Sequence, residues 1–439
     1  MRLRSCFLYT VAFLLVAVVC VAIAVTTVAR GQRAASLERL NATLAARGFS
    51  IGEAGAPNAP APLPPEVAPG DTPADEEDAE SVLRAFADLM ARVKERQQGE
   101  HWRPMLDLIG GEDPRSWSEA QWGQLRDFLD ANQDLIEAVR LLAAKGQPLV
   151  RLPWPFNPEA SQEHLSVARE LARLLAVDAL LGGHDGDYDR TAVDIEACLG
   201  FADAIARDGW VTSGLFSFAI VGIAHVALRD AVAPGALTAA ESAALVEAMG
   251  GAYGRDTLAI CLAREATVGQ QALEEHRARN VFLRPMWDID QAAHAEMMDT
   301  LIAAADRPYY EVLPELEAME AQLEGGLPFL RVITRVSVPA LTRTLQAQAR
   351  RVATVDLMRM GLLLERQYAD NGQYPDSLDA IAPDLGGTVP VDPFTGEPYR
   401  YLPSGDTFRL YSVGPNGADD GGMHDARRGD IVWRGREAE

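Results

Sequence analysis

The sequence is poor in lysine, cysteine and aromatic residues. Lys94 and Lys145 are its only lysines, so arginine carries nearly all of the positive charge. The formal net charge is −23 at pH 7, and such an acidic chain lacks the clustered cations that contacts with phosphate groups require. The composition therefore argues against a nucleic-acid partner and favours a surface kept soluble by self-repulsion.

Motifs of enzymes and of zinc sites are missing as well. There is no C-x-x-C pair, no H-E-x-x-H, no G-x-S-x-G and no glycine-rich phosphate or dinucleotide loop. The seven histidines are scattered, and no two of them have the i, i+3 or i+4 spacing of metal ligands on one helix face. We therefore predict no catalytic residue and no organic cofactor, with a hydrolase site in the helical region kept as an alternative.

The four cysteines divide into two pairs. Cys6 and Cys20 lie in an apolar N-terminal run, whereas Cys198 and Cys261 lie in helical patterns. In an oxidising compartment the second pair could form a disulfide. Two buried free thiols are the favoured alternative, because small buried cysteines are common in helix cores.

One long hydrophobic run is present, at residues 6–29, and it contains no charged side chain. At about 1.5 Å per residue it can cross a bilayer core of about 30 Å. It is longer than the apolar stretch of a cleaved signal peptide, which has about 7–15 residues. We predict a retained transmembrane signal anchor at 6–29 with a cytoplasmic tail at 1–5 and an exported body. Arginines flank the run on both sides, so the charge pattern alone does not fix this orientation.

The segment that follows, residues 30–80, is predicted to be an acidic linker rich in proline and alanine. Seven prolines lie between residues 57 and 73, and the acidic run 75–78 comes near its end. Such a composition favours an extended spacer that holds the body away from the membrane.

Residues 81–349 follow a helical rhythm almost throughout, which predicts an all-α domain of antiparallel hairpins. Helix starts are marked by an N-cap signal with an acid in the first turn in the segment Ser116 to Ala120, and by the capping box from Thr238 to Glu241. A second apolar run, 214–228, is short and contains His225. We predict that it is a core helix and that His225 is a hydrogen-bonded core residue.

One acidic turn in this region imitates a calcium-binding loop. Asp185, Asp187 and Asp189 alternate, and Glu196 stands at the twelfth position, but the sixth position is Arg190 where the loop requires glycine. The acidic N-terminus of a helix, favoured by the helix dipole, is the preferred interpretation.

Residues 350–439 change character. A helix through 355–368 is followed by a turn at 371–375 and by short strands at 399–402 and 408–413, which alternate like a half-buried sheet. This pattern predicts a small α+β domain in which a helix packs on an antiparallel sheet, followed by an acidic, glycine-rich loop.

Three ordered motifs in this domain resemble the C-terminal part of the major pseudopilin of type II secretion systems. They are Asn371-Gly372-Gln373-Tyr374-Pro375, the segment from Asp392 to Tyr401, and the segment from Tyr411 through Gly417 to Trp433. The resemblance covers about a fifth of the chain. The prepilin-peptidase site that begins true pseudopilins is absent, so assembly as an ordinary filament subunit is not expected.

The resemblance implies a calcium site in the final loop, which would use Asn416, Asp419, Asp420 and Asp430. These residues offer the oxygen ligands that calcium prefers. Asn416 stands where the family has an aspartate, Gly429 stands where a second acid is common, and two arginines (427 and 428) lie in the loop. Calcium binding and a solvated acidic loop remain alternatives.

Together these features predict a mainly α protein of the bacterial inner membrane, single-pass, with its body outside the cytoplasm. The expected function is that of a non-enzymatic interaction or structural protein of the cell envelope. The expected partners are envelope or secretion-apparatus proteins and the membrane itself. A component or partner of a type II secretion or pilus-like apparatus is the first alternative.

Overall fold

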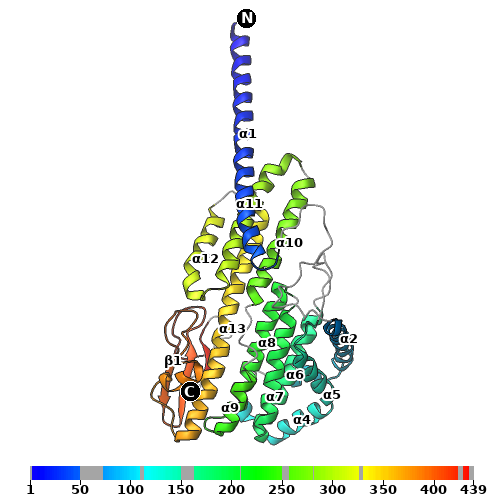
Figure 1. Cartoon of the computed structure of the whole chain (residues 1–439), viewed down its shortest axis with the longest axis vertical. Coiled ribbons are helices and arrows are strands. Elements are labelled where there is room, and N and C mark those ends of the chain that lie inside the picture. Colours follow the sequence, from blue (N-terminus) through cyan, green and yellow to red (C-terminus); the bar gives the residue numbers. More distant parts are fainter. Residues whose placement is uncertain are drawn as a thin grey trace. The chain divides into compact units, whose positions relative to one another are not determined.

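The computed structural model is mainly helical, with a small antiparallel sheet near the C-terminal end of the chain (Figure 1). The predicted fold class is confirmed at this level. The chain forms two compact units. The structure describes residues 2–49, 73–108, 113–149, 163–207, 209–249, 257–279, 281–325, 330–423 and 429–434.

Unit 1 combines the N-terminal helix with segments from the later part of the chain, Met1–Pro64, Leu262–Asp306 and Leu313–Arg343. Its elements are α1 (Arg2–Ala45), most of α10 (Thr257–Arg279), η3 (Val281–Leu283), α11 (Arg284–Ala304), most of α12 (Tyr309–Glu324) and the first part of α13 (Val332–Asn371).

In unit 1, α1 packs along α11, and the two helices run in the same direction, because Arg33, Thr43 and Arg47 contact successively later residues of that part of the chain. Arg33 donates to Gln291 near the start of this contact. Arg47 pairs with Asp306 near its end. Leu40, which lies between the two arginines, is fully buried. The second half of α1 is therefore a packed member of the bundle.

This packing changes the predicted linker. Residues 30–45 continue α1 because their apolar positions are covered by α11, and α2 (Pro73–Arg96) begins before the predicted end at residue 80. Most of the proline-rich stretch, 50–72, lies outside the described residues. The extended spacer therefore stays a prediction for that stretch only.

Residues 6–29, the predicted membrane anchor, lie within α1. Their side chains up to residue 23 lie outside the described residues, so the span stays a prediction. Among the described residues, one helix is long and apolar enough to cross a membrane by length and composition. It is α8 (Val211–Ala231), which contains the second apolar run.

Unit 2 comprises Pro65–Cys261, Arg307–Val312 and Thr344–Glu439. Besides α2 and α8, its elements are α3 (Trp102–Leu106), η1 (Pro114–Ser116), α4 (Glu119–Asp130), α5 (Gln133–Lys145), α6 (Glu163–Asp185), α7 (Tyr188–Ala206), α9 (Ala239–Ala248), the rest of α13, η5 (Leu378–Leu385), β1 (Arg400–Ser404), β2 (Thr407–Ser412) and β3 (Ile431–Arg434).

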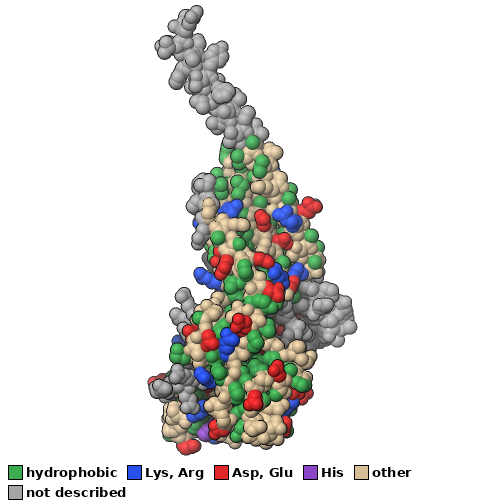
Figure 2. Space-filling view, turned by 90° about the vertical axis from the view of Figure 1, so that its left-hand side faces the viewer, with side chains coloured by type: hydrophobic (Ala, Val, Ile, Leu, Met, Phe, Trp, Pro, Cys, Tyr) green, Lys and Arg blue, Asp and Glu red, His purple; other side chains and the backbone are tan. Residues whose placement is uncertain are grey.

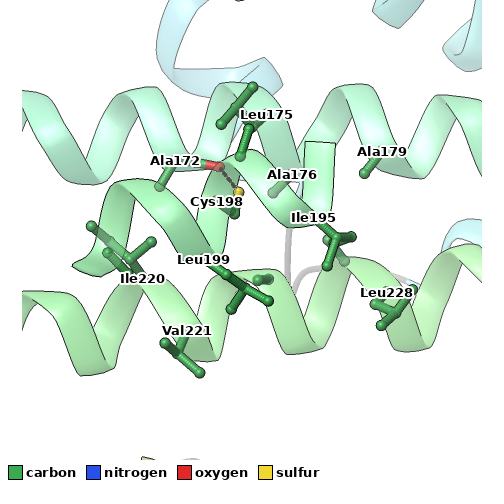
Figure 3. Close-up of a cluster of buried hydrophobic side chains, with 14 of the residues drawn as sticks. Ala172, Leu175, Ala176, Ala179, Ile195, Cys198, Leu199, Ile220, Val221 and Leu228 are labelled. Atoms are coloured by element: carbon green, nitrogen blue, oxygen red, sulfur yellow. Dashed lines mark hydrogen bonds between the residues drawn. The ribbon is translucent and has the colours of Figure 1, made fainter. Parts of the chain in front are cut away.

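The centre of unit 2 is the three-helix contact of α6, α7 and α8. Figure 3 shows side chains from all three helices meeting there, including Leu175 from α6, Ile195 from α7 and Leu228 from α8, each of which is fully buried. Burying one such side chain stabilises a fold by about 1.5–3 kcal/mol. The packing of α8 supports the prediction of a core helix, and His225 is buried as predicted.

The C-terminal segment adds a three-stranded antiparallel sheet in the order β1-β2-β3. The two predicted strands are confirmed as β1 and β2, whereas β3 follows the acidic loop and was not predicted. Trp433 of β3 is 1% exposed and packs against Gly361 of α13. The predicted boundary at 349/350 falls inside α13, and the sheet shares one apolar core with the helices of unit 2.

Local signals in the sequence correctly marked two helix starts. Ser118 caps α4 and forms a capping box with Gln121. The predicted box of Thr238 and Glu241 caps α9. Cys198 and Cys261 are buried and form no disulfide, as favoured, and the Cys198 thiol donates to the Ala172 carbonyl at 3.5 Å (Figure 3).

Candidate functional site

The acidic loop between β2 and β3 is folded around the carboxylate of Asp430. Asp430 is fully buried and accepts hydrogen bonds from the backbone N–H groups of Gly422, at 2.7 Å, and Asp420, at 3.3 Å. Pairing between β2 and β3 brings this carboxylate under the loop. Asp430 therefore stabilises the loop from within.

The other predicted ligands lie nearer the surface of the same loop. The Asn416 amide donates to the Asp420 carboxylate at 2.9 Å. Asp419 accepts from Tyr411 and from the Gly421 N–H, both at 2.9 Å. The structure thus brings the four predicted residues into one loop, where most of their oxygens already accept hydrogen bonds.

Electrostatics distinguishes the two best-defined carboxylates of the loop. Burial raises the pKa of Asp430. The two backbone N–H groups that donate to its carboxylate oppose this rise, because they favour the charged form. The Gly421 N–H, with Tyr411 and Arg400, lowers the pKa of Asp419.

Within the part of the chain that the structure describes, no group of three or more His, Cys, Asp or Glu side chains is placed to hold a metal ion. Residues 424–428 of the loop lie outside the described residues.

A further buried carboxylate supports this loop and was not predicted as a site residue. Asp392 is 2% exposed and accepts from the N–H groups of Phe394 and Val413, both at 3.0 Å. It joins the turn before β1 to the end of β2, directly before the acidic loop. The Asp-Pro-Phe-Thr-Gly sequence of that turn was the available signal, because Asp commonly bonds the backbone two residues on.

Another cluster joins the sheet to the helices of unit 2. The Glu365 carboxylate of α13 is fully buried and accepts from the Arg434 guanidinium at 2.6 Å and from the Gly235 N–H at 2.8 Å. The Tyr374 hydroxyl lies 3.1 Å from it. Burial raises the pKa of Glu365, whereas Arg434 opposes the rise. No sequence motif marked this cluster, because its members lie in four separate segments.

Two aspartates meet inside the helical bundle, which is the pattern that would favour a hydrolase. Asp178 of α6 and Asp194 of α7 are both fully buried. Arg140 contacts both, and Arg190 pairs with Asp178. Burial, with the nearby Asp178, raises the pKa of Asp194 well above its usual range. Arg140 and Arg190 bind these two acids and so tie α5, α6 and α7 together, while one oxygen of Asp194 is buried without a hydrogen-bond partner among the described residues.

The calcium-like turn at 185–189 forms the acidic N-terminus of a helix, which was the interpretation preferred from the sequence. Asp187 caps α7, its carboxylate accepting from the Arg190 N–H at 3.1 Å. Asp185 forms a two-point ion pair with Arg126, at 2.7 and 2.9 Å. Glu196 lies on the third turn of α7, away from the cap. The turn thus serves the start of α7.

Comparisons with known proteins add no assignment: no family model, no curated protein and no solved structure matches this chain.

Proposed function

We propose that this chain is a single-pass protein of the bacterial inner membrane, anchored by residues 6–29, with its body outside the cytoplasm. It acts as a non-enzymatic interaction or structural protein of the cell envelope. One observation carries the proposal. α1 contains the whole uncharged run and continues without a break into the packed helix of unit 1. An anchor built in this way transmits the position of the membrane directly to a folded unit.

The charged clusters of unit 2 fit a structural role. Asp178 and Asp194 are engaged by arginines, and Glu365 accepts from three separate segments. A general acid or base has to meet substrate with its reacting oxygen. Buried carboxylates that bind their own neighbours instead hold a surface in one shape, which is what an interaction protein needs.

The anchor is tested by placing a charge in the middle of the run. The full chain should stay in the membrane fraction after alkaline carbonate extraction. Leu15→Arg should release most of it, because arginine at the centre of a span costs about 2.5–3.5 kcal/mol. The matched control is Leu141→Arg, at a position of α5 that is 69% exposed, and it should stay in the membrane. Release of the unchanged chain by carbonate would contradict the anchor.

Orientation needs its own measurement. Protease added to intact spheroplasts should digest the body of the chain if the body lies outside the cytoplasm. A body that is digested only after lysis would reverse the orientation and leave the anchor in place.

For the acidic loop we propose calcium binding through oxygens of Asn416, Asp419, Asp420 and Asp430. The resemblance to pseudopilins and the gathering of these residues around Asp430 support it. Calcium at about 100 times its Kd should stabilise the fold by about 2.7 kcal/mol over the same chain with chelator. Asp430→Asn should abolish this difference, whereas Asp406→Asn, in the exposed turn between β1 and β2, should keep it. Equal melting temperatures with calcium and with chelator would contradict calcium binding and favour a solvated acidic loop.

A component or partner of a type II secretion or pilus-like apparatus is the second candidate. It is favoured by the three ordered motifs and by the antiparallel sheet that follows α13. Cross-linking in intact membranes, followed by identification of the captured proteins, should recover secretion-apparatus subunits if this candidate is correct. Recovery of other envelope proteins alone would favour the general interaction role.

A further inference from the structure

The turn between α10 and α11 carries three consecutive hydrophobic residues that face solvent. Val281, Phe282 and Leu283 form η3, and they are 60%, 94% and 43% exposed. Phe282 is therefore almost completely uncovered. A run of exposed large apolar side chains of this kind marks a surface that contacts something else.

The packing of unit 1 fixes where this turn lies along α1. Hydrogen bonds from α1 to α11 and the residues just after it join positions 255 to 259 apart in the sequence, and both helices run in the same direction. If the same offset of about 256 is applied towards the N-terminal ends of the two helices, residues 25–28 lie level with residues 281–284. The turn therefore lies beside the last residues of the apolar run 6–29. In Figure 1 it is found at the end of unit 1 from which α1 extends.

Two side chains of α1 at this level, on either side of Thr26 and Thr27, are also apolar and exposed. Val25 is 47% exposed and Val28 is 58% exposed. Figure 2 shows hydrophobic side chains gathered at this end of unit 1, with acidic side chains beginning farther from it. Two separate segments thus present apolar surface at one level.

Cations stand on both sides of the turn. Arg277 is paired with Glu274 and Asp288, and Arg279 with Glu275, whereas Arg284 follows the turn directly. Arg30 of α1 is exposed near the same level. Trp287, half-buried, lies 5.2 Å from the His276 ring. Arginine and tryptophan beside an apolar tip are the residues that sit among lipid headgroups at a membrane interface.

We infer that the turn Val281–Leu283 inserts into the interfacial layer of a phospholipid bilayer, beside the span of α1. The inference rests on the proposed anchor and goes beyond it, because it gives unit 1 a second point of attachment. One span allows a domain to rotate about its axis and to tilt. Two attached points joined by the packing of α1 on α11 fix which side of unit 1 faces the lipid.

The test places a polarity-sensitive probe on the turn in the full chain. Cys6 and Cys20 are replaced by serine, and Cys198 and Cys261 are buried, so a cysteine introduced by Phe282→Cys is labelled selectively. Because Phe282 is 94% exposed, the substitution leaves the packing intact. The matched control is Val336→Cys on α13, also in unit 1 and 76% exposed.

Both labelled chains are reconstituted into vesicles of phosphatidylcholine and phosphatidylglycerol. The probe at 282 should shift to the blue and be quenched more than about two-fold by lipids that carry a spin label near the headgroup. The probe at 336 should show neither change. Two probes equally exposed to water on a chain that still floats with the vesicles would overturn the inference and keep the anchor.

Two further outcomes are informative. A chain that fails to float with the vesicles would overturn the anchor and the inference together. A blue shift at 282 without quenching by lipid, accompanied by disulfide cross-linking of two unlabelled Phe282→Cys chains, would assign the turn to contact with a second copy and overturn the membrane contact.

Discussion

Gly361 is the point on α13 where the helix backbone meets the indole of Trp433. A Cβ at this position would lie 2.3 Å from two atoms of that ring, so the ring or the helix would have to move. At Gly222 on α8, by contrast, nothing lies within 4 Å of the same added atom. Two helical glycines of one unit thus differ in their surroundings alone.

Gly361→Ala should destabilise unit 2 by about 1–3 kcal/mol, because overpacking exceeds the gain in helix propensity. Gly222→Ala should stabilise it by up to about 1 kcal/mol. Chemical unfolding of the full chain in detergent, followed by tryptophan fluorescence, measures both changes. If the two alanine variants shift stability in the same direction, the close contact with Trp433 is not present.

His294 makes the stability of unit 1 depend on pH. Its ring is buried, lies 3.0 Å from the Gln270 amide, and has a pKa that burial lowers to about 4, against an opposing effect of Asp290. The folded state therefore favours the neutral ring. This contribution to stability is present above the unfolded pKa of about 6.5 and is lost as the pH falls towards 4.

Between pH 7 and pH 5, His294 alone should remove about 2 kcal/mol of stability. The His294→Asn variant cannot titrate there, so its stability should fall less over the same range. The comparison uses the slope with pH, because the substitution itself also leaves a cavity. Equal slopes in both proteins would mean that the buried ring is not neutral in the fold.

At the scale of elements, α13 begins with a cap supplied by another helix. The Asp290 carboxylate of α11 accepts from the N–H groups of Ile333, at 2.9 Å, and Thr334, at 3.1 Å, and from the Thr334 hydroxyl at 2.6 Å. An N-cap is ordinarily the residue before the helix. Here the cap lies more than 40 positions earlier in the chain.

Asp290→Ala should cost about 2–3 kcal/mol, because it leaves buried N–H groups without an acceptor. Asp290→Asn keeps one acceptor oxygen and should cost less. Thr238→Ala removes a local, exposed cap of α9 and should cost about 1 kcal/mol. Hydrogen exchange should show faster opening of the first turn of α13 only in the Asp290 variants. Unchanged exchange in that turn would contradict the prediction that Asp290 stabilises the start of α13.

The same scale shows where sequence patterns suffice. The starts of α4 and α9 follow from capping residues next to the helices they begin. The length of α1 did not follow, because Leu40 and Leu44 are buried in a part of α1 that packs on α11, a helix about 250 residues later in the chain. β3 was also missed: it has four residues, and it is a strand because β2 offers it an edge.

At the scale of the whole molecule, Glu365 joins the C-terminal sheet to the helices of unit 2. Removing Arg434 leaves this buried carboxylate without its cation. Arg434→Met should therefore cost about 3–5 kcal/mol, and adding Glu365→Gln should recover a large part of that loss. Chemical unfolding of the single and double variants measures the difference. A double variant as unstable as the single one would show that the charge of Glu365 is not what the arginine compensates.

The residues of the candidate site were proposed from the sequence, because the three ordered motifs resemble a family whose final loop binds calcium. The sequence could not show that Asp430 is buried while Asp419 stays near the surface. That difference depends on which residues β3 and β2 place beneath the loop. The support from Asp392 and the Glu365 cluster likewise comes from segments that meet only after folding.

What the sequence determined by itself is local in origin. Helical periodicity gave the mainly α class, capping residues gave helix starts, and alternation gave β1 and β2, since each depends on neighbours within a few residues. Tertiary structure alone decided the membership of the two units, the path of α1 along α11, and the placement of the hydrophobic turn 281–283 beside residues 25–28. Those features depend on contacts between residues hundreds of positions apart, and no local pattern specifies which of two apolar surfaces will meet.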